Sequence, residues 1–158
     1  MNKLDRLVAN YSRQVSLPWE KSIAGPQRVW FVVYDPADER RLRAHLGEFQ
    51  IATEQNKRGW HVCDLTDIFP EWLSTQEYRD AFFASPEDMA TALPELRAFA
   101  AKRLADMLRA ASDTDVVAVI GFGSIFGLLH VSDIVKDVET AIRGRLVGFF
   151  PGVFEKNN

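Results

Sequence analysis

The chain of 158 residues is poor in cysteine and lacks any long apolar run. A single cysteine excludes an intrachain disulfide and is typical of a protein from the reducing cytosol. No apolar stretch approaches the roughly 20 residues that a membrane-spanning helix needs. The first residues, MNKLDRLVANYSRQ, do not contain the apolar segment of a signal peptide. The sequence therefore predicts a cytoplasmic protein that does not enter the membrane.

Basic residues are also in the minority, because 19 lysines and arginines stand against 22 aspartates and glutamates, for a net charge of -3. A protein that binds a phosphate backbone needs clustered lysine and arginine. The one basic cluster, ERRLR at residues 39–43, follows a helical pattern that is typical of a solvated helix face. We therefore expect no direct binding of nucleic acid.

The sequence does contain four short apolar runs, which are separated by stretches of helical periodicity. The runs are Arg28–Tyr34, Trp60–Leu65, Val116–Ile120 and Leu146–Phe150. The first of them, Arg28–Tyr34, is nearly all β-branched or aromatic and fits a strand that is buried on both faces, as in a parallel sheet. Strands that alternate with helices predict right-handed crossovers. We expect a single α/β domain over residues 1–158, with a mainly parallel sheet of about four strands, flanking helices and Rossmann-like topology.

Helical patterns and turn signals fill the segments between these runs. Residues 3–16 form an amphipathic pattern, and residues 17–26 form a connector that contains two prolines and a glycine. Asp35 is expected to cap a helix that begins at Pro36 and stops near Gly59. Two further short helices are predicted over residues 67–73 and 76–83.

A strong helix start follows at residues 85–88, where a serine cap precedes a proline and two acids. Pro94 is expected to interrupt this helix and to open a new one that ends near Ser112. In the later part of the chain, Asp133, Asp137 and Glu139 are expected to form a solvated face of the crossover helix.

The Gly-Phe-Gly-Ser turn at residues 121–124 is the sharpest local signal. Glycines at such a turn allow positive φ, and a helix that follows would offer its N–H groups to an anion. The dinucleotide fingerprint needs a glycine where Phe126 stands, and the Gly-Lys-Ser/Thr of a P-loop is missing. We interpret the turn as a tight strand-to-helix joint with Ser124 as the helix cap. Phosphate or nucleotide binding by Gly121, Gly123 and Ser124 is the alternative.

The residues with catalytic or metal-binding potential do not form a recognisable motif. A nucleophile elbow needs glycines two residues before and after Ser124, where phenylalanines stand, so a small hydrolase is only a weak alternative. His61 and Cys63 share one face of a strand, but zinc needs three or four ligands and no second pair has the spacing. Cys63 is expected to be a small core residue. We expect no catalytic residue, metal or cofactor.

Aromatic residues are frequent, with 11 phenylalanines and four tryptophans. Phe122 and Phe126 flank Ser124 at the expected carboxyl edge of the sheet. Most aromatic residues are expected in the core, but exposed ones at a sheet edge would indicate a partner interface.

Four segments in this order resemble BrxB, a small component of the BREX (bacteriophage exclusion) defence systems of bacteria. They are a strand ending Tyr34-Asp35-Pro36, a strand ending Asp64-Leu65, the strand and turn at residues 119–124, and Val-Gly-Phe-Phe-Pro-Gly at residues 147–152. The combination of the Gly-x-Gly-Ser turn with Phe-Phe-Pro-Gly about thirty residues later is the most specific part.

The resemblance implies a non-catalytic accessory protein that acts beside a DNA methyltransferase, an AAA-type ATPase and the alkaline-phosphatase-like protein PglZ. A direct complex with a PglZ-like protein is the expected partnership. The family continues past Phe-Phe-Pro-Gly into a further strand, so this chain is expected to be truncated or a short member. Gly127 stands where the family commonly has proline, which affects the expected start of the crossover helix.

Overall fold

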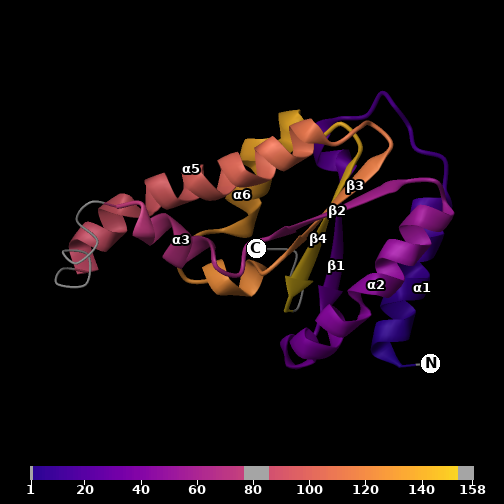
Figure 1. Ribbon diagram of the computed structural model, residues 1–158, viewed down its shortest axis with the longest axis horizontal. Helices are drawn as coiled ribbons and strands as arrows, with labels where there is room; N and C mark the ends of the chain where they lie inside the picture. Colours follow the sequence, from indigo (N-terminus) through magenta and orange to yellow (C-terminus); the bar gives the residue numbers. More distant parts are fainter. Residues whose placement is uncertain (1, 77–85, 153–158) are drawn as a thin grey trace.

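A four-stranded parallel sheet forms the centre of the chain (Figure 1). The computed structural model describes residues 2–76 and 86–152. The strands are β1 (Val29–Tyr34), β2 (Gly59–Asp64), β3 (Asp115–Ile120) and β4 (Arg145–Pro151), in the spatial order β1-β4-β3-β2. All three pairings are parallel. The predicted α/β fold with four parallel strands and flanking helices is confirmed.

Helices cover both faces of this sheet. The helices are α1 (Lys3–Ser16), α2 (Glu39–Gln55), α3 (Ile68–Ser74), α5 (Pro86–Ala110) and α6 (Val131–Val138), with short 3-10 turns η1 (Gly25–Arg28), η2 (Pro36–Asp38), η3 (Phe122–Ile125) and η4 (Glu139–Ala141). Figure 1 shows α1 and α2 together on one side of the sheet, while α5 and α6 lie on the other. None of the described helices has the length and apolar character needed to span a membrane.

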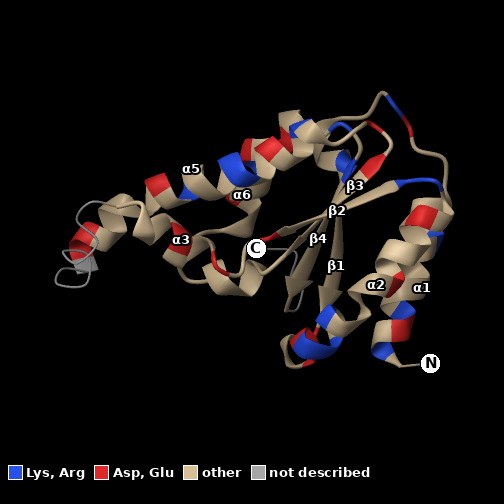
Figure 2. Ribbon diagram, in the orientation of Figure 1, with Lys and Arg blue, Asp and Glu red and all other residues tan. Residues whose placement is uncertain are grey.

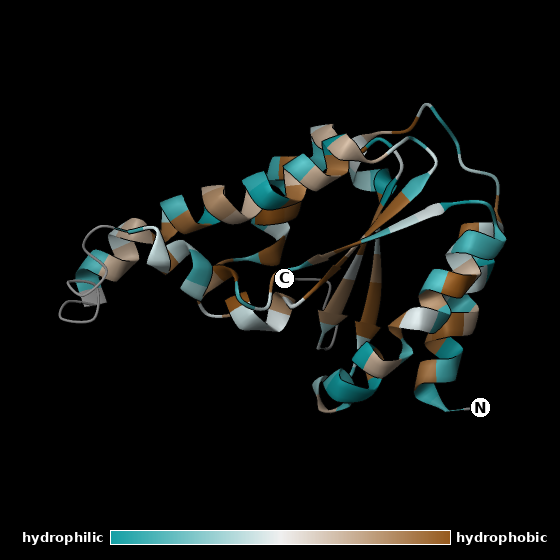
Figure 3. Ribbon diagram, viewed as in Figure 1, coloured by the Kyte–Doolittle hydropathy of each residue, from teal (hydrophilic) through white to brown (hydrophobic). Residues whose placement is uncertain are grey.

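Two hydrophobic clusters on opposite faces hold these layers together. One joins α1 and α2 to the sheet through residues such as Tyr11, Phe49 and Phe149, and the other joins α5 and α6 through residues such as Leu104 and Ile134. Strands β1 and β4 are among the most apolar parts of the molecule, whereas β2 is partly hydrophilic (Figure 3). Charged residues gather on the helices and loops (Figure 2). Burial of this apolar surface is the main stabilising term of such a fold.

The position of β1 corrects one expectation from its sequence. Its apolar run predicts a strand buried on both faces, but β1 is an edge strand. Val32 and Tyr34 are buried on the face that α1 and α2 cover, whereas Phe31 on the other face is 39% exposed. By contrast, β3 lies inside the sheet and is buried from Val116 to Ile120. Apolar content alone does not distinguish the two environments.

The amino-terminal helix is anchored as its amphipathic pattern predicts. Leu4, Tyr11 and Val15 are buried, and Asn2 and Asp5 form a capping box at the helix start. The Thr53 hydroxyl donates to the Phe49 carbonyl at 2.8 Å, so the Tyr11 hydroxyl must donate to Thr53. Burial raises the pKa of Tyr11 to about 12. This buried hydrogen bond fixes α1 against α2.

Among the predicted helix boundaries, Asp35 is confirmed as a cap, since its carboxylate accepts from the Ala37 N–H at 2.9 Å. The interruption predicted at Pro94 is wrong, because α5 runs through this residue without a break. The predicted crossover helix is also displaced, since α6 begins only at Val131. The helix predicted over residues 76–83 and the cap at position 85 lie outside the described residues, apart from Gln76.

The uninterrupted α5 helix makes Pro94 a site of unfavourable backbone energy. Proline in a helix interior removes one hydrogen bond and crowds the preceding turn. Pro94 is exposed, so its replacement loses little packing. We expect Pro94→Ala to raise the free energy of unfolding by about 1–3 kcal/mol, after the entropy gained by the unfolded chain is subtracted.

Urea unfolding followed by tryptophan fluorescence measures this change. Glu95→Ala, at the exposed neighbouring position, is the control and should change stability by less than about 0.5 kcal/mol. A Pro94→Ala variant that is no more stable than the parent would show that α5 accommodates proline without cost.

Candidate protein-interaction surface

The carboxyl edge of a parallel sheet is where open α/β proteins usually bind ligands. Here Gly121, directly after β3, has a φ of 87°, in the left-handed region. A Cβ atom on Gly121 would lie 2.4 Å from the Thr66 nitrogen and 2.7 Å from the Thr66 hydroxyl oxygen. The backbone after β3 is therefore in direct contact with the loop after β2. Glycine is required here for packing between two loops.

A chain of polar contacts continues from this loop along the same edge. The Asp64 carboxylate accepts from the Thr66 N–H at 2.9 Å, and Arg43 donates to the Thr66 hydroxyl at 2.7 Å. Arg43 also pairs with Asp64 at 3.5 Å and with Glu39 at 3.4 Å. Glu39 in turn accepts from the Tyr34 hydroxyl. The basic cluster at residues 39–43 thus contributes Arg43 to a network linking the ends of β1 and β2.

Ser124 does not have its predicted role as the cap of the crossover helix. The segment after Gly121 forms the 3-10 turn η3, and α6 starts seven residues beyond Ser124, so Ser124 does not cap a helix. Its N–H donates to the Gly121 carbonyl at 3.1 Å. No α-helix begins at this turn, so the phosphate-binding alternative would have only the N–H groups of η3 available, and it stays a prediction. Gly123 does not have positive φ, so only Gly121 of the two glycines needs that conformation.

The two phenylalanines that flank Ser124 point in different directions. Phe122 is fully buried, so its predicted place at a partner interface is wrong. Phe126 is 43% exposed, and its ring centroid lies 5.4 Å from that of Phe150 on β4. Phe150 also contacts Phe31 on β1, at 6.3 Å between centroids. Phe31, Phe126 and Phe150 together form what we call the aromatic patch.

Gly148 makes the positions of the Phe31 and Phe122 rings possible, although the residues around Gly148 in the sequence do not predict this role. A Cβ atom at Gly148 would lie 2.9 Å from the Phe31 ring and 3.1 Å from the Phe122 ring. The missing side chain lets the Phe31 ring lie across β4, while Phe122 enters the core. Because strand order decides which residues meet, Phe31 and Phe150 could not be assigned to one surface from the sequence.

The residues with metal or nucleophilic potential on β2 do not combine into a site. The His61 Nε2 atom lies 2.9 Å from the carboxylate of Asp115, at the opposite end of the sheet from the Gly121 turn. Cys63 is 1% exposed, and burial raises the pKa of its thiol to about 11. The prediction that Cys63 is a small core residue is confirmed. A buried thiol with this pKa is a poor nucleophile.

The acids of α6 contribute to packing between helices. Asp137 accepts two hydrogen bonds from the Arg97 guanidinium of α5, at 2.7 and 2.8 Å. Asp133 lies 3.7 Å from the same group, so one arginine offsets the repulsion between the two acids. Hydrogen bonds from Arg97 lower the pKa of Asp137. These residues therefore tie α6 to α5, in addition to facing solvent.

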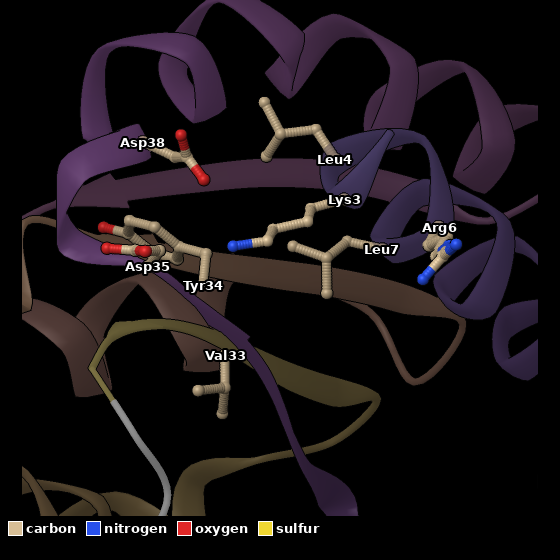
Figure 4. A pocket seen from close by; sticks show the side chains of 8 residues that line it. All are labelled: Lys3, Leu4, Arg6, Leu7, Val33, Tyr34, Asp35 and Asp38. Atoms are coloured by element: carbon tan, nitrogen blue, oxygen red, sulfur yellow. The ribbon is translucent and has the colours of Figure 1, made fainter. Parts of the chain in front are cut away.

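A shallow groove of about 260 Å³ lies between the start of α1 and the end of β1 (Figure 4). The acids that line it already have structural partners, because Asp35 caps η2 and Asp38 pairs with Arg41. In Figure 4 the Lys3 side chain extends into the groove toward Tyr34. The groove is therefore a small surface depression, and its two aspartates already have structural partners. Its lining residues are Lys3, Leu4, Arg6, Leu7, Val33, Tyr34, Asp35 and Asp38.

Comparisons of the chain with protein-family models, with curated proteins and with solved structures found no match. Support for a function therefore comes from the chain's own residues.

The Gly121 contact predicts a sharp difference between two neighbouring glycines. Gly121→Ala should destabilise the fold by about 2 kcal/mol or more, because alanine disfavours positive φ and its Cβ would clash with Thr66. Gly123→Ala should be nearly neutral, since a Cβ atom at Gly123 would lie 3.6 Å from the Pro151 ring, an ordinary van der Waals contact. Equal stability of the two variants in urea unfolding would contradict the assignment of the close contact to Gly121.

The Asp64 network predicts a dependence of stability on pH. Burial acts to raise the pKa of Asp64, but hydrogen bonds from Thr66 and the charge of Arg43 outweigh it and lower the pKa. The unfolded chain therefore takes up the proton first, and the contribution of Asp64 is lost as pH falls below about 4. We expect Asp64→Asn to be less stable than the parent at pH 7 and the difference to narrow toward pH 2. A difference that is constant with pH would contradict this role.

Proposed function

We propose that this protein is a non-catalytic interaction subunit of a BREX anti-phage complex and that it binds a PglZ-like protein through the aromatic patch. The observation that carries the proposal is the meeting of the two most specific BrxB-like motifs. The Gly-Phe-Gly-Ser turn and the Phe-Phe-Pro-Gly segment lie thirty residues apart in sequence, but the Pro151 ring is 3.6 Å from the Cβ position of Gly123. The Phe-Phe-Pro-Gly segment contributes Phe150 to the patch, and the Gly-Phe-Gly-Ser turn borders it.

The composition of the patch supports a role in protein binding. Aromatic side chains are enriched in the centres of protein interfaces, where a few of them supply most of the binding energy. Phe126 is the most suitable contact residue, because it is 43% exposed and its ring is positioned by a tilted contact with the ring of Phe150. A solvent-exposed aromatic residue that is held in one place loses little conformational freedom on binding.

The arrangement of polar groups supports a role without catalysis. Within residues 2–76 and 86–152, no serine, threonine or cysteine side chain forms a hydrogen bond with a histidine. The carboxyl edge, where an α/β enzyme would hold its substrate, is occupied by contacts among Arg43, Asp64 and Thr66. We place the subunit in the cytoplasm, with the methyltransferase and the ATPase as further members of the assembly and without direct contact to nucleic acid.

Size-exclusion chromatography with a PglZ-like protein, preferably one encoded beside this chain, tests the proposal at micromolar concentration. We expect the two proteins to elute together. Phe126→Asp should weaken the affinity about 30-fold or more, which corresponds to the roughly 2 kcal/mol that defines an interface hot spot. A biosensor titration provides the dissociation constants.

Ile51→Asp is the matched control, because Ile51 is 55% exposed on α2, on the other face of the sheet. This variant should bind like the parent. Separate elution of the parent protein and its candidate partner would contradict the proposed function. Binding of Phe126→Asp with parental affinity would contradict the aromatic patch as the docking surface and leave the partnership itself intact.

A further inference from the structure

Three metal-ligating side chains meet where α1 lies against α2, on the face of the sheet opposite the aromatic patch. Asp5, His45 and Glu48 each offer one ligand atom, and these atoms all lie within 4.8 Å of one another. Asp5 comes from the first turn of α1, while His45 and Glu48 come from the middle of α2. Residues three apart on a helix share one face, so the two α2 side chains project together.

The packing of the two helices holds this cluster in place. Leu4, next to Asp5, is buried at 4% exposure, and Phe49, next to Glu48, is fully buried. The Asp5 N–H also donates to the Asn2 side chain at 2.8 Å, which fixes the start of α1. The three ligands are therefore carried by rigid helical backbone rather than by loops.

The hydrogen bonding of His45 leaves one ring nitrogen available. Its Nδ1 atom lies 2.8 Å from the Arg41 carbonyl oxygen. A carbonyl can only accept, so Nδ1 carries a proton, and in the neutral imidazole Nε2 has the lone pair. Histidines that ligate metals commonly donate their other N–H to a backbone carbonyl, which fixes the tautomer and the ring orientation. His45 is thus prepared to act as a ligand through Nε2.

The charge of the cluster is unbalanced. Throughout the part of the chain that the structure describes, neither Asp5 nor Glu48 forms an ion pair with a lysine or arginine. Other acids, such as Asp64, Asp106 and Asp137, do have such partners. Two carboxylates that approach each other without a cation repel, and a bound divalent ion would reverse this repulsion.

We propose that Asp5, His45 and Glu48 bind a divalent transition-metal ion of the zinc class. One imidazole and two carboxylates are suitable ligands for zinc, and three protein ligands leave the fourth position for water. Magnesium and calcium, which prefer all-oxygen ligand sets, fit less well. The ion would join α1 to α2 and thereby stabilise the attachment of the amino-terminal helix.

Isothermal titration of the untagged, metal-free chain with zinc tests the site, together with thermal unfolding in the presence of zinc. We expect one ion per chain and a midpoint of unfolding that rises with zinc and returns after chelation. His45→Ala and Glu48→Gln should each weaken zinc binding roughly tenfold or more, since even changes around metal ligands cost 10- to 100-fold. Cobalt should give the visible absorption bands of a low-coordinate site, which depend on His45.

His130→Ala is the matched control, because His130 is exposed and lies outside the cluster. This variant should bind zinc like the parent and show the same increase in midpoint. If His45→Ala fails to fold, Glu48→Gln and the cobalt spectrum of the parent still decide the question. No heat of binding with zinc, or an affinity unchanged by both His45→Ala and Glu48→Gln, would overturn the proposed site.

Discussion

The contact between Gly121 and the Thr66 backbone is the constraint that determines how the chain is arranged after β3. Only a residue without a side chain lets the end of β3 approach the loop after β2 to this distance. The approach joins the loops after β2 and β3 at the edge of the sheet where open α/β proteins usually bind ligands. It also directs the following turn, so that Phe122 enters the core and Phe126 emerges beside Phe150.

Because these loops contact each other, the proposed binding function lies on the surface of the molecule and not in a pocket at this edge. The hydrogen-bonding groups of Asp64 and Thr66 are engaged with each other and with Arg43. The aromatic patch, where β1 and β4 lie side by side, includes the partly exposed Phe31 and Phe126. The glycine-rich turn that resembles a ligand loop therefore acts as a packing joint, and its motif positions the aromatic residues around it.

Four strands and the amino-terminal helix could be predicted because hydrophobic periodicity is a local property. Strand order is not a local property, so the edge position of β1 and the contact between Phe31 and Phe150 could not be predicted from the sequence. Pro94 was expected to break a helix, but packing of Leu96, Ala100 and Leu104 holds α5 together through it. The cluster of Asp5 with His45 and Glu48 cannot be predicted for the same reason, since Asp5 lies forty residues before His45 in the sequence.

Hydrogen–deuterium exchange, with and without a PglZ-like partner, tests the central claim most directly, because it locates the contact surface without a substitution. The account predicts that the partner protects residues 122–126 and the carboxyl half of β4, while α2 exchanges as in the free protein. Protection confined to α1 and α2, with the aromatic patch unchanged, would contradict it.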